Sequence, residues 1–126
     1  MAARSFTITI DNLTGLPWHR IGLGLDHGEW SNNGGSVPPE NIPGASFDVF
    51  GHLSYTPVTF GNESDGFATG AQGFVDYQNA LGSILHIAWD NPYIGSNSFD
   101  ANASNPFTAS YGDISGNNAN VVVEVK

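Results

Sequence analysis

The residues that could carry out acid–base or metal chemistry are few, and their spacing does not suit it. The four histidines lack the His-x-x-x-His spacing of a zinc-binding helix. The absence of cysteine excludes disulfides, thiolate zinc sites and cysteine nucleophiles, and no Gly-x-Ser-x-Gly nucleophile elbow occurs. Asp90, Asp100 and Asp113 fall in expected loops and suit calcium, but the EF-hand pattern is missing. We therefore expect no enzyme activity, no cofactor and no metal site.

The aromatic residues are more informative. Trp18, Trp30 and Trp89 each stand beside turn or polar residues rather than inside apolar runs. The segment Trp89–Asn97 sets large side chains among turn residues, which predicts a surface loop with partly exposed rings. Such rings suit a lipid interface, stacking on sugars or a protein-binding hot spot. The alternative is that the rings cap the open end of a protein core.

Short strands are the elements available to position these rings. Sixteen glycines and seven prolines are spread along the chain, which argues against long helices. Alternating apolar residues bounded by turn residues predict half-buried strands, and residues 31–46 read as a long loop. The fold class is therefore all-β, with residues 1–126 forming a single-domain β-sandwich. The predicted strands lie within residues 6–10, 21–25, 47–60, 73–77, 83–89, 107–111 and 119–125.

The charge balance limits the binding partners. Twelve acidic residues face three lysines and arginines, a formal net charge of −9, so the chain cannot build the basic face that nucleic acid requires. The same balance disfavours adsorption to anionic lipid. A membrane partner would then be a neutral or zwitterionic lipid or a receptor, unless the charge serves only solubility.

No apolar run has the length of a signal peptide or a membrane-spanning helix. We therefore expect synthesis in the cytoplasm without a signal peptide, and action on a target-cell membrane after release.

Four blocks of sequence occur in an order that resembles the aegerolysin family. They are Asp11–Gly15, His27–Trp30, Glu63–Gly70 and Asp90–Asn97, and Phe99-Asp100 follows the last. The chain is most similar to the small component of bacterial binary insecticidal toxins that act on beetle larvae such as corn rootworm. The resemblance implies an actinoporin-like β-sandwich that recognises gut-cell membrane lipid or a receptor and contributes to pore formation with a second protein.

When the binding site of the family is transferred to matching positions, the resemblance implies a membrane-binding site of Trp89, Asp90, Pro92 and Tyr93, with Trp30 nearby. Fungal members have other residues on either side of this proline, where the present chain has Asn91 and Tyr93. The resemblance therefore does not imply that the chain shares their lipid specificity. Replacing Trp89 and Tyr93 together with alanine is expected to abolish membrane binding and to leave the fold intact.

A fully buried aromatic side chain contributes only about 2–3 kcal/mol to such docking. Stable attachment is therefore expected to need self-association, a second toxin protein, or both. A carbohydrate-binding lectin-like module is the main rival function, and a structural or storage protein is a further one.

Overall fold

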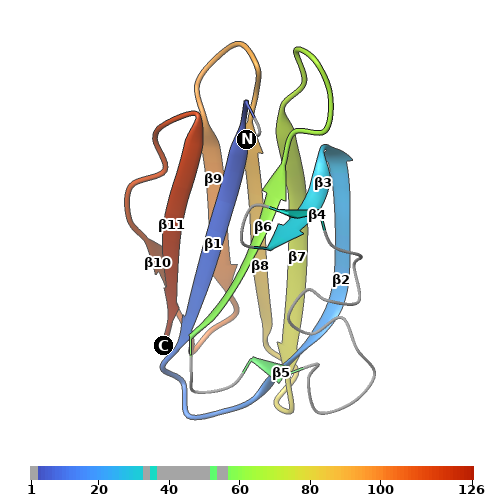
Figure 1. The fold of residues 1–126 in the computed structure, drawn as a ribbon. Helices are drawn as coiled ribbons and strands as arrows, with labels where there is room; N and C mark the ends of the chain where they lie inside the picture. Colours follow the sequence, from blue (N-terminus) through green and yellow to red (C-terminus); the bar gives the residue numbers. More distant parts are fainter. Residues whose placement is uncertain (1–2, 33–34, 37–51, 54–56) are drawn as a thin grey trace.

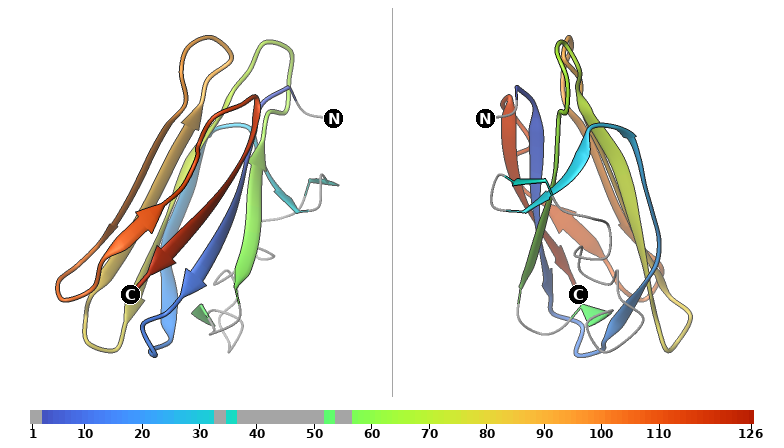
Figure 2. Two further views of the ribbon diagram at one scale, coloured as in Figure 1. Left: turned by 90° about the vertical axis from the view of Figure 1, so that its left-hand side faces the viewer. Right: turned by 45° about the vertical axis from the view of Figure 1, so that its right-hand side comes forward.

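The computed structural model describes residues 3–32, 35–36, 52–53 and 57–126. In these residues eleven β-strands form two sheets that face one another across an apolar core (Figures 1 and 2). No helix in the described ranges is long and apolar enough to cross a bilayer. The predicted all-β sandwich is confirmed, whereas the single-domain organisation of residues 1–126 stays a prediction.

The first sheet contains the two ends of the chain. Its first and last long strands lie side by side and parallel, with Ser5 opposite Asn118 and Asn12 opposite Val125. Both strands alternate between buried and more exposed residues, so one face of each packs on the core. In spatial order the strands are β10 (Ala109–Tyr111), β11 (Asn118–Val125), β1 (Ser5–Asn12), β6 (Val58–Glu63), β3 (Glu29–Asn32) and β4 (Gly35–Ser36).

The second sheet is antiparallel throughout. Its spatial order is β5 (His52–Leu53), β2 (Trp18–His27), β7 (Ala71–Asn79), β8 (Ile84–Asn91) and β9 (Ser98–Ala103). The hairpin of β7 and β8 turns through residues 80–83, with Gly82 at a positive φ of 85°.

The core between the sheets is rich in aromatic and β-branched residues. Phe6, Ile8 and Ile10 enter it from β1, and the buried valines of β11 enter beside them. From the second sheet come Trp18, Tyr77 and the alternating apolar residues of β8. In β1, β8 and β11 the two-residue period of the sequence is therefore the period of burial, whereas in β2 a register shift between Arg20 and Gly22 leaves Ile21 53% exposed.

The strand predictions hold where alternation is regular and fail elsewhere. Residues 98–103 form β9, which was not predicted, because Ser-Phe-Asp-Ala-Asn-Ala lacks the β-branched residues that mark a strand. Residues 31–32 and 35–36 are strand rather than the predicted loop. The rest of the predicted loop, and most of the expected strand region before Val58, lie outside the described residues.

The two ends of the sandwich differ in the connections they carry. At one end, uppermost in Figure 1, β6 leads to β7 through residues 64–70 and β8 leads to β9 through residues 92–97. We call these two segments together the loop end. The β7–β8 turn lies at the opposite end, at the bottom of Figure 1.

Candidate functional site

The two segments of the loop end pack directly against each other at Gly70. A Cβ atom on this residue would lie 2.7 Å from the Asn91 carbonyl oxygen and 3.0 Å from Pro92 Cα. Only glycine allows this approach without a shift of the backbone. A groove of about 510 Å³ runs beside the contact, lined by His27, Ala68, Thr69, Gly70, Gln72, Asp90, Pro92, Tyr93 and Ile94.

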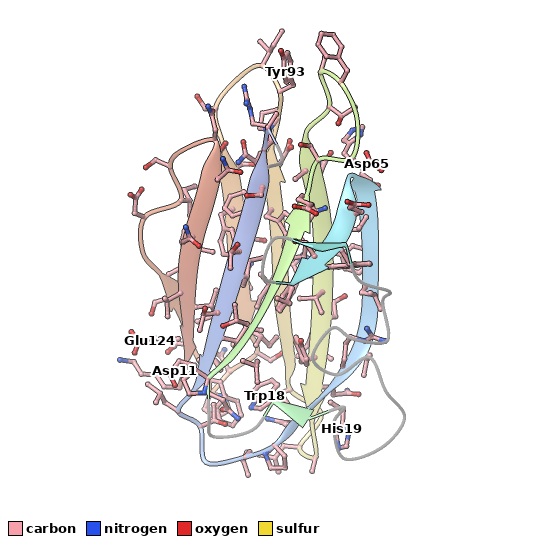
Figure 3. All side chains as sticks on the ribbon, in the orientation of Figure 1. Asp11, Trp18, His19, Asp65, Tyr93 and Glu124 are labelled. Carbon is pink, nitrogen blue, oxygen red and sulfur yellow. The ribbon has the colours of Figure 1, made fainter. Side chains whose placement is uncertain are left out.

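Large apolar side chains project from the loop end into solvent. The exposed fraction is 96% for Phe67, 86% for Ile94 and 39% for Tyr93. Figure 3 shows Tyr93 and Asp65 at this end of the molecule, with Trp18 and His19 at the opposite end. Phe67 and Ile94 lie on different segments of the loop end, and these segments touch at Gly70, so both side chains are exposed at the same end of the sandwich.

The turn that carries Phe67 is held by local hydrogen bonds. The Thr69 hydroxyl donates to the Gly66 carbonyl oxygen at 2.8 Å and accepts from the Gly66 amide at 3.2 Å. Ala68 has a positive φ of 56°, a conformation that is unfavourable for residues other than glycine. The turn therefore presents an aromatic ring to solvent at a cost in backbone energy, which marks it as a candidate functional feature.

Trp89 and Trp30 belong to the core beneath the loop end. Trp89 lies within β8 rather than on a loop and is 2% exposed, and Trp30 is 6% exposed. The centres of the Trp30 and Trp89 rings lie 6.0 Å apart, and the Phe60 ring packs against both. The Trp89 indole N–H donates to Asn62 Oδ1 at 2.9 Å. Tyr93 is partly exposed, as expected. The two tryptophans, which were also expected to be partly exposed, are buried and cap the core.

Asp90, Pro92 and Tyr93 come together on the groove of the loop end. The assignment of these residues, Trp30 and Trp89 to a lipid site stays a prediction. In this conformation the two tryptophans contact core residues rather than solvent, so their expected part is to support the loops from below.

Phe67 and Ile94 are the exposed residues that sequence reasoning did not assign to the site. The segment Glu63–Gly70 entered the sequence analysis only as part of the family resemblance, which made no prediction about the burial of Phe67. The available signal was a phenylalanine placed between Asp65-Gly66 and Thr69-Gly70, where turn residues on both sides leave no strand to bury it.

Buried asparagines fasten the strands below the loops. Asn91, which is 1% exposed, donates from Nδ2 to the carbonyl oxygens of Ser5, Gly116 and Asn117 at 2.8–3.2 Å. It thereby links β8 of one sheet to the start of β1 and β11 in the other. This inter-sheet contact fixes where the β8–β9 segment leaves the sandwich.

The acidic residues do not form a metal site in the part of the chain that the structure describes. Asp90 and Asp100 lie in strands β8 and β9 rather than in the expected loops. The described residues contain no group of three or more His, Asp or Glu side chains placed to hold a metal ion.

A pair of carboxyl groups near the loop end gives a pH-dependent contribution to stability. Burial and the adjacent Glu29 carboxyl, which is also its hydrogen-bond partner, raise the pKa of Glu63 above its ordinary value. The ionised form is thus disfavoured in the folded protein, and the destabilisation is complete above the folded-state pKa and vanishes below the unfolded-state pKa. Glu63→Gln is expected to raise the melting temperature slightly at neutral pH and to leave it unchanged at a pH below the ordinary carboxyl range. A gain of equal size at both pH values would contradict this origin.

The fold and the loop end define a two-sheet β-sandwich protein with exposed apolar side chains on two loops at one end. The sequence profile described as Aegerolysin matches residues 3–126, and the chain belongs to the aegerolysin family.

Solved structures share the fold at low sequence identity. The RahU protein, crystallised with a TRIS molecule, superposes with a TM-score of 0.80 at 14% identity, over 99% of this chain and 96% of RahU. IP-1A from Alcaligenes faecalis gives a TM-score of 0.76 at 19% identity, covering 98% and 91%. The lipid binding protein Nakanori gives 0.80 at 12% identity, covering 100% and 72%. No protein of curated function matches the sequence significantly.

Proposed function

We propose that the protein binds a membrane of neutral or zwitterionic lipid through its loop end, with Phe67, Ile94 and Tyr93 entering the interface. The observation that carries the proposal is the exposure of two large apolar side chains on loops that pack together at one end of the sandwich. Membership of the aegerolysin family supports it, as does the shared fold with Nakanori, a lipid binding protein.

The energetics favour docking at the membrane surface over insertion. Full burial of a phenylalanine or isoleucine side chain contributes about 1.5–3 kcal/mol, and the tyrosine ring suits the head-group region. A domain of net charge −9 cannot enter the hydrocarbon core cheaply. The sandwich therefore stays in water and inserts only the tip of the loop end.

We further propose that this docking makes the protein one component of an insecticidal binary toxin. Two or three side chains give weak attachment, so a pore needs several copies, a second protein, or both. The support for the insecticidal role and the second protein is the sequence resemblance. In this proposal the protein acts on the gut-cell membrane after its release.

Co-sedimentation with phosphatidylcholine liposomes tests the docking proposal. The double variant Phe67→Ser, Ile94→Ser is expected to lose about a hundredfold in membrane affinity, because each buried side chain contributes about tenfold or more. Each single variant should show part of that loss. The fold should remain intact, because both side chains are solvent-exposed.

Leu81→Ser is the matched control. Leu81 is 71% exposed and lies in the β7–β8 turn at the opposite end of the sandwich. Its replacement removes a similar apolar area and should leave membrane affinity unchanged. Equal losses in the control and the double variant, or no loss in either, would contradict the assignment of the loop end.

Dye release from the same liposomes distinguishes the mechanisms, because leakage by the protein alone would mean that it forms pores without a second protein. Binding to glycans, with none to glycan-free liposomes, would favour the lectin-like alternative.

A further inference from the structure

Arg4 connects both segments of the loop end. Its backbone amide donates to Ser64 Oγ at 3.1 Å, and its carbonyl oxygen accepts from the Ser64 amide at 2.8 Å. Its guanidinium donates from Nε to the Pro92 carbonyl oxygen at 3.2 Å and from Nη2 to that of Tyr93 at 2.8 Å. The guanidinium also lies 4.9 Å from the centre of the Tyr93 ring. Arg4 is therefore a positioning residue for the β8–β9 segment.

Among the described residues, the Arg4 guanidinium has no acidic partner, despite the acidity of the chain. The sequence has twelve carboxylate side chains against three lysines and arginines. The Arg4 guanidinium makes its hydrogen bonds to backbone carbonyls, including that of Ala3. Its positive charge is thus not neutralised by a side chain in the described structure.

The Arg4 guanidinium also retains donors for a ligand. Three of its five N–H groups donate to carbonyl oxygens, and the other two have no acceptor among the described residues. Arg4 borders a hollow of about 360 Å³ on the β8–β9 side of the loop end. The residues lining the hollow carry amide, hydroxyl and apolar groups and no carboxylate: Asn91, Pro92, Gly95, Ser96, Asn97, Ile114, Ser115, Gly116 and Asn117.

We propose that Arg4 binds a phosphate diester in this hollow, supplied by the lipid head group when the loop end docks. The inference rests on the proposed membrane docking and specifies which part of the lipid is recognised. A guanidinium presents planar, charge-assisted donors that match phosphate oxygens. Because it stacks on Tyr93, it lies immediately behind the residues that enter the interface, at the level of the head groups. A phosphate diester is present in zwitterionic lipid, which the acidic chain can approach without net repulsion.

Two kinds of liposome separate phosphate recognition from loop positioning. With phosphatidylcholine liposomes, Arg4→Gln is expected to lower affinity about tenfold, the contribution of a charge-assisted hydrogen bond. With phosphate-free liposomes of digalactosyldiacylglycerol, Arg4→Gln should lose clearly less affinity than on phosphatidylcholine, because there it loses only its positioning of the β8–β9 segment. Arg4→Lys keeps the charge without the planar fork and should fall between wild type and Arg4→Gln on phosphatidylcholine. Equal loss on both lipids would overturn phosphate binding and leave only the positioning role, and no loss on either would overturn both.

Glycerophosphocholine in solution tests the site without a bilayer. The Arg4 Nε–H resonance of the wild-type protein should shift on titration with this compound and not with glycerol. A shift in a protein that binds no liposome would reject the membrane proposal while retaining a site for free phosphate diesters. The absence of any shift, together with unchanged liposome binding by Arg4→Gln, would reject the phosphate site and retain the docking proposal.

Discussion

Replacing Trp89 with alanine is expected to lower the free energy of unfolding by about 3–5 kcal/mol. The indole is 2% exposed and packs against Trp30 and Phe60, so its removal leaves a cavity between the two sheets. The change also removes the N–H donor to Asn62 Oδ1, an acceptor that is itself fully buried. Urea denaturation followed by far-ultraviolet circular dichroism measures the loss.

Tyr93→Ala is the matched control for this prediction. Tyr93 is 39% exposed and makes its ring contact with Arg4 at the surface, so its replacement should cost less than about 1 kcal/mol. The expectation that a double Trp89, Tyr93 variant keeps its fold conflicts with the buried position of Trp89. Loss of membrane binding by that variant would be uninformative unless it is shown to be folded. Equal stability of Trp89→Ala and wild type would contradict the core position.

Replacing Asn91 with aspartate is expected to destabilise the fold by about 3–5 kcal/mol at neutral pH. The change is nearly isosteric, but it converts a donor of three hydrogen bonds into a carboxylate that faces the Ser5, Gly116 and Asn117 carbonyl oxygens. The position is 1% exposed, so water cannot compensate the charge. Thermal or urea unfolding measures the effect.

The control for Asn91→Asp is Asn120→Asp. Asn120 lies in β11 on an exposed position, so the same change in charge should alter stability by less than about 0.5 kcal/mol. A similar small effect at Asn91 would mean that its amide does not hold the two sheets together at the loop end.

The sandwich could be predicted from local alternation, because a strand with one buried face has apolar residues at every second position of its own sequence. The runs around Ile8, Val75 and Ile87 have the two-residue period that the structure confirms. Strand β9 carries polar and small residues and is defined by its pairing with β8, a contact between chain segments. The pairing of β1 with β11 is likewise non-local, and no pattern within either strand specifies it.

The sequence predicted a surface loop within Trp89–Asn97, and residues 92–97 do connect two strands, but it did not predict the burial of the Trp30 and Trp89 rings. Trp30 belongs to the first sheet and Trp89 to the second, and each ring is covered by the other and by Phe60. The residues next to a tryptophan in the sequence do not show that a strand of the other sheet will pack over its ring. Tyr93, beyond the end of β8, has no opposing strand and remains partly exposed, as its turn-rich surroundings indicated.

The burial of all three tryptophans decides what the intrinsic fluorescence of this protein can report. Trp18, Trp30 and Trp89 are 0%, 6% and 2% exposed and lie inside the sandwich. Shielded indoles emit at short wavelength and are poorly reached by aqueous quenchers such as iodide. If only the loop tips enter the lipid, the emission spectrum stays the same in the presence of liposomes. A red shift or new quenching would instead record separation of the two sheets, so the same spectrum distinguishes a rigid adaptor from a protein that refolds in the membrane.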